Sequence, residues 1–477
     1  MTRIGLKTTA RLATVTSALL LSGCMAFSPD AGMTIVSDVT TQAIAKTAVS
    51  VKTPAQAEQA DAAVKRLLAR PLTADSAVQI ALINNKGLQA IYNELALAEA
   101  DAIQESLPPN PTFSASRITG NGASEIEKQV VGDVLALATL PVRSDIARDR
   151  FRQAQLAAAL ETLRLAAETR RAYISAVAGN ELAILLTSAK TTAASTAQLA
   201  KKLGETGALN KLDQAREQVF YAETTADLAA AKQAASSSRE RLIRLMGLWG
   251  GDLAFRLPER LPSLPRAPRT LPDIEVAAVG HRLDLQIARI DVVALAKSLE
   301  LTQATRFVTL LDVSGIGKRT RDPDTSVFRE RGLEVQFQIP IFDGGEVRVR
   351  QATEIYNNAF NRLTEKAVNV RSEARDAYRS YRATYDIARH YQKEVLPLRQ
   401  IISEEMQLRL SGMQVDVFAL LIEARQQIAS QRAALGAKRD FWLAESDLRA
   451  VIYGGAGGSG SSASTVSVAQ APAAGAH

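Results

Sequence analysis

Residue types that commonly carry chemistry are scarce in this chain of 477 residues, which has one cysteine and three histidines. His281, His390 and His477 lie far apart, and none takes part in a His-x-x-His or similar metal-ligand spacing. No Ser/His/Asp arrangement is present, and the carboxylate pairs are those of any charged helix surface. A single cysteine excludes a disulfide framework and a cysteine metal cluster. We therefore expect no enzyme active site, no metal site and no cofactor.

The one cysteine, Cys24, lies in a setting that predicts a covalent modification. A basic N-terminal segment precedes a short apolar stretch at residues 12–21, too short to span a membrane. The following Leu21-Ser22-Gly23-Cys24 resembles a bacterial lipobox, in which cleavage before the cysteine leaves that cysteine lipidated. The alternative is an ordinary signal peptide with an incidental cysteine. The position, the small residues and the uniqueness of the cysteine favour residues 1–23 as a lipoprotein signal peptide.

Asp343-Gly344-Gly345 places a carboxylate beside two glycines, which suggests either a phosphate-binding loop or a tight turn. The Gly-x-x-x-x-Gly-Lys-Ser/Thr spacing of a phosphate loop is missing. A strand-to-helix turn is favoured, with Asp343 capping the helix and the two glycines allowing the backbone to turn.

Apolar residues recur with different periods on the two sides of this turn. Residues 332–341 alternate with period two, so that one face carries Leu333, Val335, Phe337, Ile339 and Ile341 and the other carries Glu334, Gln336 and Gln338. Beyond the turn, residues 370–395 follow the four-and-three spacing of a coiled-coil helix. Pro397 predicts a kink or break later in that helix. A strand with one apolar face feeding a long helix predicts a membrane barrel continued by a helical tube.

The same order of elements occurs twice along the chain. Each repeat reads helix, two strands, long helix, turn, helix, with Leu140-Pro141 matched to Ile339-Pro340 and Gly207 matched to Gly412. Expected helices include 73–106 and 272–304, and expected strands are 112–119, 129–140, 307–318 and 332–341. The predicted divisions are a signal peptide at 1–23, an extended and partly helical segment at 24–70, a first repeat at 71–248, a Pro-rich linker at 249–271, a second repeat at 272–453 and a disordered Gly/Ser/Ala tail at 454–477.

Composition and dimensions narrow the fold. Hydrophobic content is 47% and aromatic content only 5%, and no stretch beyond the first residues approaches the about 20 apolar residues of a spanning helix. Any membrane crossing must then use strands. A helix of about 60 residues is about 90 Å long, too long for a globular domain. Four strands are fewer than the roughly eight that close a membrane barrel, so three copies would have to share one barrel of twelve strands.

The formal charge is +7, but no basic run with interleaved aromatics indicates nucleic acid.

Over about residues 70–453 the chain resembles the TolC family of outer-membrane efflux channels, the outer membrane factors, in the lipoprotein branch that includes CusC and OprM. The resemblance is carried by Ile339-Pro340-Ile341-Phe342-Asp343-Gly344-Gly345, by Glu394-Val395-Leu396-Pro397-Leu398, by the duplication and by the lipobox. It implies a mainly α fold with a small β-barrel portion: a homotrimer whose 12-stranded β-barrel lies in the outer membrane and continues as an α-helical barrel through the periplasm. It also implies two protein partners, a periplasmic adaptor (membrane fusion protein) and an inner-membrane pump. Met25 after the cysteine, instead of Asp, favours the outer membrane.

The resemblance also suggests functional positions. Acidic residues near the second helix turn line the closed periplasmic aperture in this family, which makes Asp416 a gate candidate and Asp213 its counterpart in the first repeat. The alternative for each is a surface or helix-start aspartate. Gly207 and Gly412 mark the helix turns that an adaptor would contact. The lipid-facing register of the first hairpin stays open, because residues 131–137 carry apolar side chains on both faces.

The expected function is a passive exit duct that takes its transport energy from a partner pump. The alternative is a lipid-anchored periplasmic coiled-coil scaffold or adaptor without a pore, which leaves the paired strands unexplained. Residues 412–418 and 440–444 are similar to members associated with copper or heavy-metal resistance, and a drug-efflux system is the other candidate.

Overall fold

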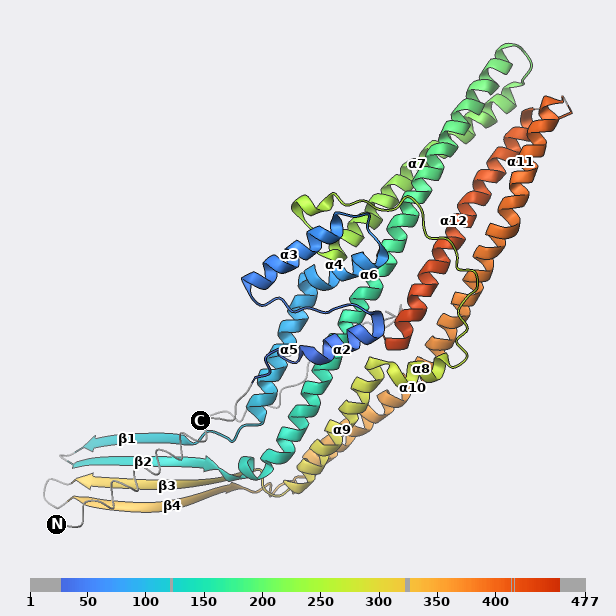
Figure 1. Cartoon of the computed structure of the whole chain (residues 1–477). Coiled ribbons are helices and arrows are strands. Elements are labelled where there is room, and N and C mark those ends of the chain that lie inside the picture. Colours follow the sequence, from blue (N-terminus) through green and yellow to red (C-terminus); the bar gives the residue numbers. More distant parts are fainter. Residues whose placement is uncertain (1–26, 121–122, 322–326, 413, 416, 455–477) are drawn as a thin grey trace.

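The computed structural model describes residues 27–120, 123–321, 327–412, 414–415 and 417–454. Cys24, Asp416 and most of the tail at 454–477 therefore lie outside the described residues. The molecule is strongly elongated: a four-stranded sheet forms one end, and the turns of two helical hairpins form the other (Figure 1).

The elements follow the duplicated order that the sequence predicts. The first repeat and its N-terminal segment contain α2 (Met33–Ile44), α3 (Pro54–Leu68), α4 (Ala74–Asn84), α5 (Lys86–Glu105), β1 (Thr112–Gly120), β2 (Ala123–Asp133), α6 (Val134–Glu205), α7 (Lys211–Met246) and the short η2 (Gly250–Leu253). The second contains α8 (Ile274–His281), α9 (Leu283–Ala304), β3 (Leu310–Arg321), β4 (Phe328–Gln338), α10 (Glu346–His390), η3 (Tyr391–Val395), α11 (Leu396–Ser411) and α12 (Val417–Tyr453).

The first helix of each repeat is broken, where the sequence pattern predicts a continuous helix. Thr73 starts α4 as an N-cap, and the chain leaves the helix at Asn85 with ψ 115°. The Asn85 side chain accepts from the Leu88 N–H (3.0 Å) to cap α5, and its amide donates to the Leu245 carbonyl (2.9 Å). The break at Arg282 between α8 and α9 is similar, with ψ 119°. Both breaks are stabilised by contacts with distant parts of the chain, which local periodicity cannot show.

The prediction of a strand over 129–140 is wrong for its second half. β2 ends at Asp133, whose carboxylate accepts from the Ala136 N–H (2.8 Å) and so caps α6. Pro141 lies inside α6, two turns after the start, and removes only one backbone donor there. Leu140-Pro141 is thus helical, whereas Ile339-Pro340 precedes the turn before α10. The two pairs are not structural counterparts.

The long helix of the second repeat is interrupted next to Pro397. Residues Tyr391–Val395 form the π-helical segment η3, and α11 starts at Leu396 with Pro397 in its first turn. A proline is tolerated in a first helical turn because its missing N–H has no partner there. The interruption is where the sequence predicts a kink or break.

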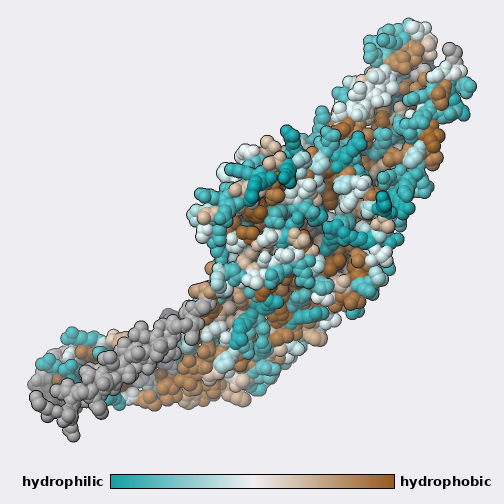
Figure 2. Space-filling model, viewed as in Figure 1, coloured by the Kyte–Doolittle hydropathy of each residue, from teal (hydrophilic) through white to brown (hydrophobic). Residues whose placement is uncertain are grey.

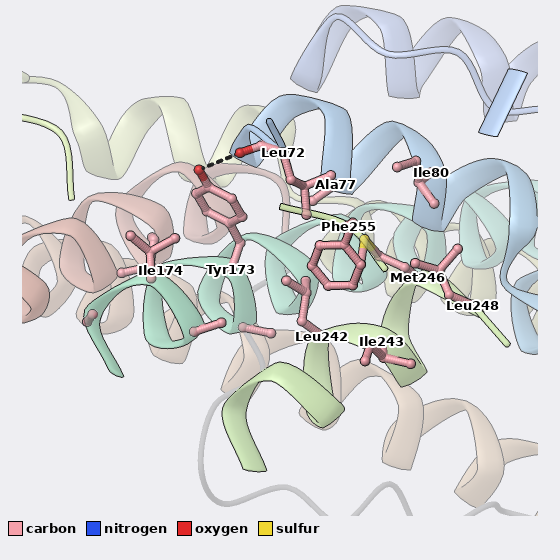
Figure 3. Close-up of a cluster of buried hydrophobic side chains, with 14 of the residues drawn as sticks. Leu72, Ala77, Ile80, Tyr173, Ile174, Leu242, Ile243, Met246, Leu248 and Phe255 are labelled. Carbon is pink, nitrogen blue, oxygen red and sulfur yellow. Dashed lines mark hydrogen bonds between the residues drawn. The ribbon is translucent and has the colours of Figure 1, made fainter. Parts of the chain in front are cut away.

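Two of the buried clusters, one in each repeat, include residues of the Pro-rich linker. In the first, α4, α6 and α7 surround Phe255, and the Tyr173 hydroxyl donates to the Leu72 carbonyl at 3.0 Å (Figure 3). In the second, Phe441 of α12 packs against the rings of Tyr381 and Tyr385 on α10, with centroids 5.6 Å apart in each case. The Tyr385 hydroxyl donates to the Pro265 carbonyl (3.0 Å). The Pro-rich linker is therefore anchored against both repeats.

The N-terminal segment packs against helices of the same chain. Helix α2 packs against α6, and α3 packs against α4 (Figure 1). The Gln89 side chain accepts from the Val51 N–H (2.8 Å) and donates to the Val49 carbonyl (2.9 Å).

One helix among the described residues, α6, contains a stretch long and apolar enough to span a membrane by length and composition. The sequence analysis did not identify this apolar stretch. Within the chain 44% of it is buried, and α6 packs along α4, α5, α7 and α9. Alanine supplies most of its buried positions, so we interpret the apolar character as a surface for close helix packing.

Candidate functional site

The strand register divides the sheet into two chemically different faces. Strands β1, β2, β3 and β4 pair in that order, all antiparallel, and residues directly opposite each other share a face. Phe113 pairs with Val130, Val130 with Gly315 and Gly315 with Leu333. The next residues on this side are Val313 opposite Val335 and Leu311 opposite Phe337. We call this side the apolar face; Figure 2 shows hydrophobic residues gathered where the sheet meets the helices.

The opposite side is polar and carries most of the charge as carboxylates. The Gln129 amide donates to Ser314 Oγ (3.0 Å) and to Glu334 Oε2 (3.3 Å), which joins three strands on this side. The strand residues here include six acids and one basic residue, Lys318, whose ammonium pairs with Glu125 at 2.6 Å. We call this side the acidic face; its acids are Glu125, Glu127, Asp133, Asp312, Glu330 and Glu334.

The same register assigns the first hairpin, which the sequence left open. Phe113 and Val130 lie on the apolar face, in one row with Leu333, while Val131 lies opposite Ser314 on the acidic face. The apparent two-sided pattern at 131–137 arises because residues from Val134 onward are helical.

The sheet is incomplete within one chain. Among the described residues, β1 and β4 each pair on one side only, and every residue of these two strands is exposed. An unpaired strand edge presents backbone donors and acceptors that need partners. Helix α10 also exposes a series of large apolar side chains: Val347, Ile355, Phe360, Val368 and Ile387. Sheet and helices both have the surfaces of a sector from a larger ring.

The turn from β4 to α10 depends on a residue that sequence reasoning missed. Gly344 and Gly345 have φ 56° and 72°, and a Cβ on Gly345 would lie 2.3 Å from the Arg306 carbonyl oxygen. Arg306 Nε donates to the Gly344 carbonyl (2.8 Å), and its guanidinium pairs with Glu346 (2.7 Å). The sequence predicted Asp343 as the cap residue of α10, and this prediction is wrong. Gly345 holds that position, and the Asp343 carboxylate accepts from the Gly345 N–H at 3.0 Å.

The two helix turns at the far end have different backbones. Gly207 is left-handed, with φ 77°, and the Ala208 N–H reaches back to the Leu203 carbonyl (2.9 Å) to close α6. Gly412 ends α11 with φ −82°, a conformation open to any residue. Both glycines are exposed at the end of the molecule opposite the sheet (Figure 1).

The gate candidates fare differently. Asp416 lies outside the described residues. Asp213 is in the first turn of α7, where its carboxylate accepts from the Asn210 amide (2.6 Å) and from Arg216 (3.0 Å). Its side chain is 18% exposed. These contacts are local to the helix start.

Ion pairs join the two helical hairpins, α6–α7 and α11–α12. The sequence analysis did not identify them. Arg425 of α12 pairs with Glu217 of α7 at 2.7 Å and lies over the Phe220 ring, 4.5 Å from its centroid. One heptad later, Arg432 pairs with Asp227 of α7 at 2.7 Å. The seven-residue spacing of these arginines was the available signal, since it places both on one helix face.

Among the described residues, no group of three or more His, Cys, Asp or Glu side chains is placed to hold a metal ion. No protein-family model matches the sequence, and no curated protein matches it.

Solved structures do match. CusC, described in terms of folding and transmembrane channel formation, superposes with a TM-score of 0.66 at 16% identity over 80% of this chain and 92% of CusC. The CmeC outer membrane channel of Campylobacter jejuni gives 0.66 at 14% identity, over 88% of this chain and 92% of that chain. The outer-membrane channel OprN gives 0.62 at 16% identity, over 91% and 97%. The chain therefore has the fold of these outer-membrane channels. The fold predicted by resemblance to the TolC family, mainly α with a small sheet, is confirmed.

Proposed function

We propose that this chain forms the outer-membrane exit duct of a tripartite efflux system, a passive channel built from three copies. The observation that carries the proposal is the two-faced sheet, which is open at both edges and continues directly into very long helices. The channel folds of the structural neighbours support it.

Three copies complete the sheet in the simplest way. The free edge of β4 in one copy pairs with the free edge of β1 in the next, which yields twelve strands, above the minimum of about eight. The apolar face then contacts lipid and the acidic face lines the lumen. Closure satisfies every strand edge, as a membrane requires.

The helices supply the second part of the duct. Helix α6 has 72 residues, which corresponds to a length of about 110 Å. Side-by-side packing of three chains covers the apolar side chains exposed on α10 and closes a helical tube in the periplasm. The turns at Gly207 and Gly412 are the ends that a periplasmic adaptor contacts, and an inner-membrane pump supplies the energy. Lipidation of Cys24 adds an anchor to the outer membrane.

The acidic face indicates the class of cargo. Each chain carries six carboxylates and one lysine on the acidic face of its strands. Rings of carboxylates in a pore attract cations and repel anions. Metal ions such as copper and cationic drugs both fit this chemistry, and export measured for each in a strain lacking its own duct separates them.

Purified protein in planar bilayers tests the proposal. We expect heat-stable trimers that resist extraction by carbonate and conduct with a reversal potential that favours cations. A matched variant, Glu127→Gln/Glu330→Gln, removes two lumen carboxylates and should lower the cation preference while the trimer persists. A carbonate-extractable protein without conductance would support the lipid-anchored scaffold instead.

A further inference from the structure

We propose that the far end of the apolar face binds the phosphate groups of anionic lipids in the outward leaflet of the membrane. The site is a basic rim formed by Arg117, Lys128, Arg319, Arg329 and Arg331. The inference rests on the proposed function, because it requires the apolar face to lie in lipid.

The register brings these residues into two adjacent rows. In the first, Arg117 pairs with Ile126, Ile126 with Arg319 and Arg319 with Arg329. In the second, Lys128 and Arg331 each pair with Gly317. Neighbouring strands are about 4.8 Å apart, so the backbones of Arg319 and Arg329 lie about one strand spacing apart.

Within the part of the chain that the structure describes, the rim has no anionic partner. All five side chains are exposed, and none forms an ion pair or side-chain hydrogen bond among the described residues. The strand carboxylates lie on the other side of the sheet, where Lys318 does find Glu125. Like charges directly opposite in a sheet destabilise it. An external anion between Arg319 and Arg329 relieves that repulsion.

The position of the rim identifies the anion as a lipid headgroup. Arg331 precedes Leu333 by two residues, which places it about 7 Å farther along the strand from the helices. Apolar side chains continue from Leu333 to Ile339 for about 20 Å toward the helices. A ligand at the rim therefore has its phosphate beside arginines and its acyl chains beside leucine, valine and phenylalanine. Inorganic phosphate would use only the first of these surfaces.

The chemistry favours phosphate over a carboxylate headgroup. Arginine presents a planar fork of donors that binds phosphate oxygens in pairs, and four of the five rim residues are arginine. The rim lies at the end of the sheet away from the helices, so it faces the leaflet on the side opposite the periplasmic tube (Figure 1). With β4 of one copy beside β1 of the next, the basic rims of the three copies follow one another around the barrel.

Lipid titration of purified, full-length trimers tests this inference. Trimers in phosphatidylcholine nanodiscs are compared with trimers in nanodiscs that also contain lipid A, a phosphorylated glycolipid. A third sample has phosphatidylcholine with inorganic phosphate in the buffer. Retained lipid is counted by native mass spectrometry, and heat dissociation of the trimer is followed on gels. We expect lipid A, and not inorganic phosphate, to be retained and to raise the dissociation temperature.

The variant Arg319→Gln/Arg329→Gln should weaken lipid A retention by about thirtyfold, because two basic residues near the surface are removed. Arg319→Lys/Arg329→Lys keeps the positive charge and should preserve most of the lipid A retention. Comparison of the two double variants separates the effect of lost charge from that of misfolding. Arg362→Gln/Arg379→Gln removes the same charge from exposed positions on α10 and should leave retention unchanged.

Equal retention by the wild type and Arg319→Gln/Arg329→Gln overturns the inference, as does an effect of inorganic phosphate as large as that of lipid A. Conductance is recorded from the same preparations. Conducting trimers without lipid A preference overturn the basic rim alone, whereas the absence of trimers and conductance overturns the proposed function and the inference with it.

Discussion

Arg425 Nη2 on α12 donates to Glu217 Oε1 on α7 at 2.7 Å, and this bond joins the two hairpins near their far ends. The Glu217 side chain is 6% exposed, and Arg425 is its cationic partner. The same guanidinium donates to the Arg216 carbonyl (3.1 Å). Arg425 therefore links the first and second repeats at the end of the molecule opposite the sheet.

Replacing this arginine should loosen the far end. Arg425→Ala leaves Glu217 buried without its cation, at a cost of about 1–3 kcal/mol after allowance for the partly exposed arginine. We expect higher basal conductance of trimers in planar bilayers. Arg409→Ala is the matched control, because Arg409 pairs with Glu405 on its own helix and both are exposed. Equal conductance of the two variants would show that this link does not restrain the tube.

The gate hypothesis at Asp416 stays a prediction from the sequence. Asp416→Ala should raise basal conductance and weaken block by multivalent cations, because three carboxylates around one axis would share a bound cation. Asp213→Ala should change neither, since Asn210 and Arg216 hold that carboxylate at the helix start. If cation block disappears in Asp213→Ala and persists in Asp416→Ala, the order of the two candidates is reversed.

The two faces of β4 can be distinguished by one substitution on neighbouring residues. Phe337→Arg places a charge on the apolar face opposite Leu311, where the proposed contact with lipid makes it cost about 2–4 kcal/mol near the bilayer centre. Gln338→Arg places the same charge on the acidic face, which the proposal assigns to the lumen. The amount of trimer in outer-membrane fractions should fall strongly for the first variant and little for the second. Similar amounts, or the reverse order, would contradict the assignment of the faces.

The turn before α10 should tolerate no side chain at Gly345. Gly345→Ala forces a left-handed backbone on alanine, at about 1–2 kcal/mol, and brings its Cβ against the Arg306 carbonyl. The heat-dissociation midpoint of the trimer should drop. Gly412→Ala serves as the control, because φ there is −82° and the nearest atom to a Cβ is 3.6 Å away. A midpoint unchanged in Gly345→Ala would mean that the turn rearranges freely.

Lipidation can be tested apart from assembly. Cys24→Ser should abolish incorporation of labelled palmitate while trimers still form, because strand pairing anchors the chain far more strongly than one acylated residue. Label that persists in the variant would refute the lipobox interpretation.

Local periodicity was sufficient for much of this architecture. The period-two pattern of 332–341 identified the two faces of β4, and the duplicated order of elements appears in the structure as expected. The β4 boundaries moved to Phe328–Gln338, because Arg329, Glu330 and Arg331 alternate in charge and not in hydrophobicity. The basic rim was missed for a different reason: its residues belong to four strands and become neighbours only through strand pairing.

By itself, the sequence determined the features that depend on neighbouring residues: the alternating strand, the coiled-coil spacing, the glycine turn and the break beside Pro397. Each follows from the geometry of one element, in which residues two, three or four positions apart share a side. The tertiary structure alone decided the register of the first hairpin, the helix breaks at Asn85 and Arg282, the part of Arg306 in the turn, and the bond from Arg425 to Glu217. These depend on groups separated by tens to hundreds of residues, and their partners are selected by how the whole chain packs.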